Sequence, residues 1–414
     1  MKSIAYFRFL LVLCCCSFAI SGLTSDKAKL NTKEEKDNSL IGSVPANQIM
    51  DSILSNFLGL LPFMSSPLKF GDKSNEKFIL AKLVNLGQGF QMATHNSLIG
   101  GANFRPSLET TQLHLQNTIE AFTAGHKDFA LTRLKATTNL CLSCHAQIDV
   151  AGKFSFKTLL GQVDRSMFAD EHEYAEFLYI LQDLDKAMLH YKKNVAAQLQ
   201  RMKSLSRIDP NILKFHNTYT RSILNSIKKI LIITVKKKRD ITLAQKYIAQ
   251  IEKMKGMPVF LIKELDGYLA QINDLKKKNL PKEFKSADEI NKFISQQLES
   301  MENIEDVSDE LNLHLVYSSG LLQEYLYNHP ASPLLPKILF WASISERQLS
   351  KSYFYSLADV YLKECIKKFP KDPYAKRCFK EYEDNLYFGY TGSGGTHLPP
   401  QEKKELETLR QMIK

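Results

Sequence analysis

The chain has 414 residues, enough for two or three domains, and its 44% hydrophobic and 24% charged residues are typical of a globular protein rather than a disordered one. The formal net charge is +11, but basic runs such as 236–239 and 276–278 fall at the ends of helical segments and contain no interleaved aromatic residues. This pattern argues against a nucleic-acid partner. It favours solvated helix ends, with docking to an acidic protein as the alternative.

Residues 1–21 have the pattern of a secretory signal peptide. Lys2 supplies the positive start, an apolar stretch runs from Phe7 to Ile20, and small residues precede a cleavage site after Ser21. The apolar stretch is too short to span a bilayer comfortably, and no other run of 18 apolar residues occurs. We therefore expect an exported, periplasmic protein with no transmembrane segment after signal removal. A lipid anchor on Cys16 is the less favoured alternative, because the residue before that cut would be another cysteine rather than Gly, Ala or Ser.

Residues 22–44 are polar and charged with few large apolar groups, which predicts a disordered leader. From about residue 46 almost to the end, apolar residues recur every three or four positions. No sustained alternating run rich in Val, Ile and Thr indicates a sheet. The expected fold class is all-α.

Four amphipathic stretches predict an antiparallel four-helix bundle over residues 45–152. Gly100-Gly101 and Pro106 separate the second stretch from the third, and Gly125 is the expected end of the third. The apolar stripes of the four stretches are Ala46, Met50, Ile53, Phe57, Leu60 and Met64; Ile79, Leu83, Leu86 and Phe90; Leu108, Leu115, Ile119 and Phe122; and Ala130, Leu134, Thr137, Cys141, Cys144 and Ile148.

Residues 153–414 are predicted to form a second helical domain. Its helices are separated by short breaks at Asp209-Pro210, Gly256, Pro281 and Pro330. Near the end, a glycine-rich segment at 391–396 predicts a flexible break before a final helix that begins at about Gln401.

The clearest unit of this domain runs from Tyr353 to Tyr390. One helix ends at Phe369-Pro370 and the next begins at Asp372-Pro373. The inward-facing residues are expected to be Leu357, Ala358, Tyr361, Leu362, Ala375 and Phe379. This unit resembles a tetratricopeptide-type helical hairpin, which implies a helical-repeat domain. An irregular helical domain is the alternative, because several copies do not align at the expected period of roughly 34 residues.

The motif with the most specific chemistry is Cys141-Leu142-Ser143-Cys144-His145. Two thiols separated by two residues can each add across a vinyl group of a porphyrin, and the histidine that follows binds the iron as an axial ligand. A thioredoxin-like redox pair would need a strand–helix context, which is absent. A zinc site would need two further ligands, and Cys365 and Cys378 do not form a second close pair. We expect one covalently bound haem c.

The motif follows about 95 residues of helical sequence and lies at the end of the fourth stretch. This arrangement resembles the cytochrome c′ family, the four-helix class II cytochromes, over residues 45–150. The resemblance implies that the haem packs within the bundle, with Cys141 and Cys144 as the thioether cysteines and His145 as the proximal ligand. The family's final helix usually carries a basic residue shortly after the histidine, whereas here four non-basic residues follow and Lys153 comes later.

The resemblance also implies that the first helix supplies the sixth iron position, as a Met ligand or as a non-ligating apolar residue. Met50 lies on the stripe of that helix, 91 residues before Cys141. A Met on such a stripe also serves simply to fill a core. Met64, Met92 and His95 are alternative ligands, and an open or water-filled position is a further one.

Two other histidines, His114 and His126, are expected at the surface.

Two functions from different classes fit these features. The first is an electron carrier, rather than an enzyme, whose helical-repeat domain docks a redox partner. The second is a five-coordinate haem protein that binds or senses a diatomic gas such as nitric oxide or carbon monoxide. A haem peroxidase is a weaker alternative, because no distal His or Glu with an Arg can be identified.

Cys365 and Cys378 are predicted to form a disulfide. Each lies five residues from a proline of the Phe369–Pro373 turn, on opposite sides of it. In an antiparallel helix pair, equal distances from the turn place two residues side by side, within the Cα separation of roughly 4.4–6.8 Å that a disulfide needs. Two buried, reduced cysteines are the alternative.

Overall fold

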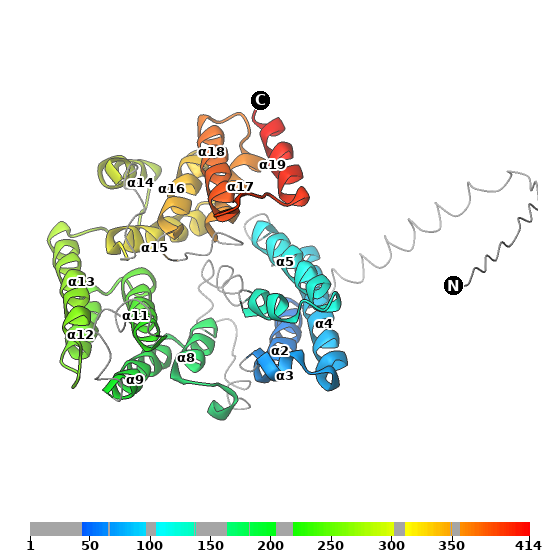
Figure 1. Ribbon diagram of the computed structural model, residues 1–414. Coiled ribbons are helices and arrows are strands. Elements are labelled where there is room, and N and C mark those ends of the chain that lie inside the picture. Colours follow the sequence, from blue (N-terminus) through cyan, green and yellow to red (C-terminus); the bar gives the residue numbers. More distant parts are fainter. Residues whose placement is uncertain are drawn as a thin grey trace, which may run out of the picture.

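The computed structural model describes residues 44–64, 67–96, 105–135, 137, 164–181, 183–203, 218–301, 311–347, 349 and 357–414. Regular structure in these ranges is helical except for one very short hairpin, which confirms the all-α fold class (Figure 1). The predicted signal peptide, nearly all of the leader and the motif at 141–145 lie outside the described residues. The boundary expected between residues 152 and 153 lies outside them as well.

The N-terminal part of the fold is a set of helices packed in chain order. These are α2 (Ala46–Met64), the short α3 (Pro67–Gly71), the 3-10 turn η1 (Lys73–Asn75), α4 (Glu76–His95) and α5 (Arg105–Thr123), followed by a helical stretch at 127–135. Helix α4 contacts both α2 and α5. The break before residue 127 contains Gly125 at φ +86°, a left-handed conformation that ends the preceding helix as predicted.

The predicted stripes of these helices face one another in a common core. Two stripe residues, Met50 and Ile119, are only half-buried and pack against its edge. The buried members are Ala46, Ile53, Phe57, Leu60, Met64, Ile79, Leu83, Leu86, Phe90, Leu108, Leu115, Phe122, Ala130 and Leu134, with Thr137 buried beside them. Helices α2 and α4 approach closely at Gly89, where an added Cβ would lie 2.6 Å from Ile53 Cγ1. The short α3, which the sequence did not predict, packs the ring of Phe70 against that of Phe122 at 5.2 Å.

The remaining helices form a longer array. They are η2 (Arg165–Met167), α8 (Glu171–Ile180), α9 (Leu184–Lys203), α11 (Thr218–Leu231), the π-helical η3 (Ile232–Lys237), α12 (Ile241–Glu252), α13 (Val259–Lys278), α14 (Ala287–Phe293), the π-helical η4 (Ile294–Leu298), η5 (Glu299–Met301), α15 (Leu313–Asn328), α16 (Leu335–Arg347), α17 (Leu357–Lys368), α18 (Pro373–Gly389) and α19 (Pro400–Met412). The predicted breaks at Gly256, Pro281 and Pro330 fall between helices, and Asp209-Pro210 lies outside the described residues.

Many helices of this array contact a neighbour in the chain, whereas α13 packs against α12 and against α15. Helix α8 contacts α9, α9 contacts α11, α15 contacts α16, and α16 contacts α17 (Figure 1). The array returns to the N-terminal helices, because α17 also contacts α5. Two hydrophobic clusters result, one centred on the N-terminal helices and one on the array.

Helix α8 belongs to both clusters. Its Phe177 is buried in the N-terminal core, and its Ala175 and Leu178 are buried in the core of the array. Leu181, directly after the helix, also joins the N-terminal core. The two cores are therefore connected by opposite faces of one helix.

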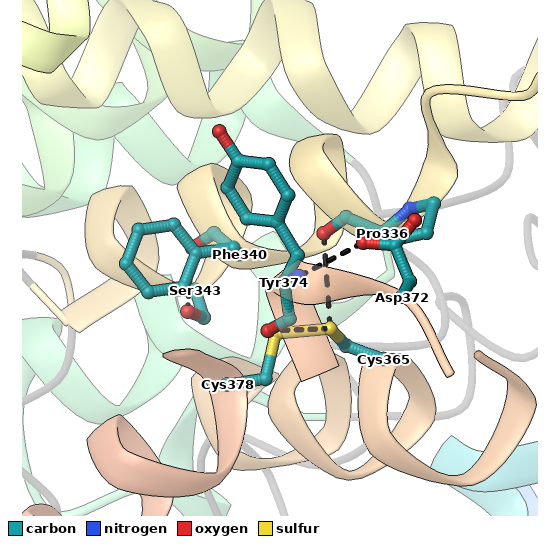
Figure 2. The surroundings of a disulfide bond; sticks show 7 residues. All are labelled: Pro336, Phe340, Ser343, Cys365, Asp372, Tyr374 and Cys378. Carbon is teal, nitrogen blue, oxygen red and sulfur yellow. Dashed lines mark hydrogen bonds between the residues drawn. A yellow bond between two sulfur atoms is a disulfide. The ribbon is translucent and has the colours of Figure 1, made fainter. Parts of the chain in front are cut away.

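Helices α17 and α18 form the hairpin that the sequence predicted, and a disulfide joins them. The side chain of Asp372 accepts a hydrogen bond from the backbone N–H of Tyr374 at 2.8 Å and caps α18. Cys365 and Cys378 form the predicted disulfide, with a Cα–Cα distance of 6.4 Å (Figure 2). Both cysteines are fully buried. All six inward-facing residues expected for this hairpin are buried as well, while Tyr353 lies outside the described residues.

The glycine-rich segment after α18 differs from the flexible break that the sequence predicted. Strands β1 (Thr391–Gly392) and β2 (Gly395–Thr396) pair as a minimal antiparallel hairpin. Gly395 adopts φ +96°, and the hydroxyls of Thr391 and Thr396 are 2.6 Å apart. Glycine permits the chain reversal, and the paired threonines join the two strands. Strands of two residues are too short to show the alternation of apolar and polar residues that predicts a strand from sequence.

No helix within the described ranges combines the length and the hydropathy needed to cross a membrane.

Candidate functional site

The candidate site is the N-terminal bundle that leads into the Cys141–His145 motif. The motif itself lies outside the described residues, so the structure bears on it through the helical stretch at 127–135. This stretch buries Ala130 and Leu134 in the core, and Thr137 is buried after it. These are the first three members of the stripe on which the sequence also places Cys141 and Cys144. The described members of this stripe thus face the bundle core.

The possible sixth ligands differ in burial. Met50 on α2 is half-buried at the edge of the N-terminal core, and so is Met92 on α4. Met64, at the end of α2, is 7% exposed and belongs to the core itself. His95 is exposed at the end of α4. Their distances from the motif lie beyond the described residues, so each remains a prediction.

His126 is exposed, as predicted, but the surface position expected for His114 is wrong. The His114 side chain, on α5, is only 1% exposed. It lies one residue from Leu115 and four from Thr118, both fully buried, so the helical turn carries it to the core side of α5. This position relative to the apolar stripe was the available sequence signal.

His114 is tolerated there because both ring nitrogens have polar neighbours on the next helix. Its Nε2 lies 2.6 Å from the backbone carbonyl oxygen of Arg133, and its Nδ1 lies 3.3 Å from Nη2 of the same residue. The Nε2–H tautomer satisfies both contacts, because it donates to the carbonyl and accepts from the guanidinium. Burial, and then the charge of Arg133, lower the pKa of His114 to about 4. The imidazole is therefore neutral near pH 7.

A second polar cluster is buried in the array. The ammonium of Lys236, in η3, lies 2.5 Å from Glu346 Oε1 of α16, and both side chains are less than a tenth exposed. The same oxygen accepts hydrogen bonds from Ser319 and from Gln323, both on α15. Burial lowers the pKa of Lys236, and the neighbouring carboxylate opposes that effect. The cluster joins three elements, but its donors are all directed at one carboxylate oxygen, so it does not suggest a ligand site.

A third polar cluster lies where α8 meets α9 and α11. Glu176 accepts hydrogen bonds from Tyr191 at 2.6 Å and from Lys229 at 2.7 Å. Burial tends to raise the pKa of Glu176, but the charges of Lys229 and His172 hold it below its usual range. This network anchors α8, the helix shared by the two cores.

Metal ligation by other residues finds no support in the described part of the chain, where no group of three or more His, Cys, Asp and Glu is placed to hold an ion. The disulfide also removes Cys365 and Cys378 as thiolate ligands for a zinc ion.

No protein-family model, curated protein or solved structure matches this chain. The resemblances to the cytochrome c′ family and to tetratricopeptide repeats therefore remain predictions.

Proposed function

We propose that this protein is an exported c-type cytochrome that carries one covalent haem and transfers electrons. The observation that carries the proposal is the sequence Cys141-Leu142-Ser143-Cys144-His145. The cysteines would hold the porphyrin through thioether bonds, and His145 would orient it as proximal ligand. The haem would supply an iron that accepts and releases one electron, while the bundle would exclude water from it.

Two features of the described residues support this proposal. The helical stretch at 127–135 directs the stripe that is predicted to continue to the cysteines toward an apolar core. In addition, the Cys365–Cys378 disulfide is the kind of bond that persists outside the reducing cytoplasm. Covalent haem attachment takes place in such a compartment, so the disulfide is consistent with the predicted export.

We further propose that the array starting at α8 is a helical-repeat domain that docks the redox partner. Contacts between helices that are neighbours in the chain, such as α8 with α9 and α16 with α17, support this proposal, because each unit of a repeat protein contacts the units next to it.

Haem attachment is tested by expressing the full chain together with a haem-maturation system. Denaturing electrophoresis with a haem peroxidase stain should show one band at the mature mass. The variant Cys144→Ala should lose the stain or retain it only weakly, whereas Cys378→Ala, which changes a cysteine outside the motif, should keep it. An unstained wild-type band would overturn the proposal.

The sixth ligand decides between electron transfer and the alternative, a five-coordinate protein that binds a diatomic gas. Six-coordinate haem with a Met ligand is low-spin, and a five-coordinate haem is high-spin. If Met50 binds the iron, Met50→Ala should change the absorption spectrum from low-spin to high-spin. A wild-type spectrum that is already high-spin would favour the gas-binding alternative. A low-spin spectrum unaffected by this substitution would exclude Met50 and leave Met64, Met92 and His95.

A further inference from the structure

The two most exposed large apolar side chains among the described residues lie where the chain turns between helices. Leu68, in the short α3, is 88% exposed, and Val259, the first residue of α13, is 70% exposed. Single exposed apolar residues are common on protein surfaces. These two therefore indicate a binding surface only if their surroundings share a further property.

The surroundings of Leu68 are basic. Residues 67–82, which include α3, η1 and the start of α4, contain four lysines and two acidic residues. Lys73 and Lys77 are exposed. Phe78, next to Lys77 in the chain, is 48% exposed and adds apolar surface. We call residues 67–82 the α3 tip.

The surroundings of Val259 are basic as well. The turn between α12 and α13 contains Lys253 and Lys255, both exposed, and no acidic residue. A further lysine from the end of α9 joins them, because Lys203 Cε would lie 2.8 Å from a Cβ added to Gly256. We call residues 253–259 the α12–α13 tip.

The two tips lie on one side of the molecule. In Figure 1, α3 and the turn between α12 and α13 are both at the lower edge, and they are separated across the view. Each tip is attached to a different hydrophobic cluster, because Phe70 is buried in the N-terminal core and Leu261 in the core of the array. A flat surface can therefore contact both tips at once.

We propose that this edge binds the surface of a membrane that contains anionic lipids. Leu68 and Val259 would enter the boundary between headgroups and acyl chains, and the lysines beside them would face the lipid phosphates. The positive charge of both tips complements such a surface. A protein partner fits less well, because protein interfaces bury one contiguous patch with an apolar centre, whereas here two single apolar residues stand apart. The inference does not depend on haem.

The experiment measures how much of the exported protein sediments with vesicles of phosphatidylcholine, with and without phosphatidylglycerol. Binding should be stronger to the vesicles that contain phosphatidylglycerol, and added salt should weaken it. The mass of the protein is checked first, because an acyl chain on Cys16 would bind vesicles by itself. Acylated protein is replaced by residues 22–414, which include every described residue.

Substitutions at the tips separate the apolar contribution from the charged one. Leu68→Gln/Val259→Gln should weaken binding to the anionic vesicles about tenfold, because two apolar side chains no longer leave water. Lys253→Gln/Lys255→Gln should weaken it roughly fivefold for each lysine removed.

Helix α19 provides matched controls at the opposite edge. It ends close to the C-terminus, which lies at the upper edge of Figure 1. Met412 is 45% exposed, and Lys403 and Lys404 are exposed. Met412→Gln and Lys403→Gln/Lys404→Gln should therefore change binding much less than the corresponding tip variants.

Circular dichroism checks that each variant is folded, and all of the changed side chains are exposed. A wild type that does not sediment with the anionic vesicles, or sediments equally with the neutral ones, would overturn the proposal. Control variants that weaken binding as much as the tip variants would overturn it too. None of these outcomes bears on haem attachment, which the haem stain tests separately.

Discussion

At the scale of single residues, burial of a polar side chain depends on whether a partner is supplied from elsewhere in the chain. His114 is buried because Arg133, nineteen residues later, offers both an acceptor and a donor to its ring. His126, one residue beyond the turn that ends α5, has no such enclosure and is exposed. The local sequence separates the two histidines in part, because His114 lies beside Leu115 within α5 and His126 follows Gly125 after that helix has ended. The polar partner that allows His114 to be buried comes only from the packing of the following helix.

The buried His114 makes stability depend on pH. The pKa of His114 is about 4 in the folded protein against an ordinary value of 6.5, so between these pH values the unfolded chain binds a proton that the folded chain does not. The free energy of unfolding should therefore decrease as the pH falls from 6.5 toward 4. One pKa unit corresponds to about 1.4 kcal/mol, so a loss on the order of a few kcal/mol is expected. Urea unfolding measured at several pH values checks this.

The matched variants are His114→Gln and His126→Gln. Glutamine at position 114 cannot titrate, so the stability of that variant should depend less steeply on pH than that of the wild type. His126→Gln makes the same substitution at an exposed position and controls for the exchange itself. Burial also lowers the pKa of His314 to about 4, so part of the pH dependence should persist in His114→Gln. Identical slopes for the wild type and His114→Gln would contradict the buried position.

At the scale of helices, a glycine can allow two elements to approach closely, and the local sequence does not show which glycines do so. Gly320 in α15 faces η3, and an added Cβ would lie 2.5 Å from the carbonyl oxygen of Lys236. This contact brings α15 against the π-helical segment that carries the Lys236–Glu346 ion pair. Gly267 in α13 is also helical, but an added Cβ there would meet nothing within 4 Å.

The two glycines predict opposite effects of the same substitution. Gly320→Ala should destabilise the protein by about 1–3 kcal/mol, because a backbone atom rather than a flexible side chain must move. Gly267→Ala should stabilise it by about 0.5–1 kcal/mol, since alanine loses less conformational entropy in a helix. Thermal and urea unfolding of both variants measure the difference. Equal shifts in the same direction would show that α15 and η3 are not in close contact.

At the scale of the whole molecule, the described residues form two cores that meet twice. They share α8, and the last helices of the array return to α5 (Figure 1). Helix α5 packs against both α4 and α17. A substitution that displaces helices in one core can therefore displace helices in the other through α5. The disulfide between α17 and α18 stabilises the hairpin that forms this second contact.

The predicted export and haem attachment together determine how many thiols the mature protein exposes on denaturation. Protein matured with its haem should show no free thiol, because Cys365 and Cys378 are joined and Cys141 and Cys144 are thioethers. The same chain, without its first 21 residues and made in a reducing cytoplasm, should show four. Thiol titration in denaturant under non-reducing conditions counts them.

Loss of the disulfide should also destabilise the folded protein. Closing a loop of this size contributes about 3 kcal/mol in the chain-entropy account. The double variant Cys365→Ala/Cys378→Ala should therefore unfold at lower urea concentration than the oxidised wild type, and reduction should move the wild type toward the variant. Two free thiols in the haem-loaded protein would contradict the disulfide.

Much of the helical architecture follows from the sequence alone. Apolar residues at spacings of three and four predicted α2, α4 and α5, and the Asp372-Pro373 pair predicted where α18 begins. The symmetry of Cys365 and Cys378 about a turn predicted their disulfide. The haem proposal likewise comes from a contiguous five-residue motif. These features are local, because a few neighbouring residues determine the backbone conformation or the chemistry.

Only the tertiary structure decided which helices meet and which polar groups they enclose. It placed His114 in a core rather than at the surface, paired Lys236 with Glu346 across 110 positions, and brought α17 back to α5. Periodicity specifies the inward face of a helix but not the helix that covers it. The partner of a buried polar group depends on which helix covers that face. The cost of removing such a group from water is compensated only by the donors and acceptors that packing brings within hydrogen-bond distance.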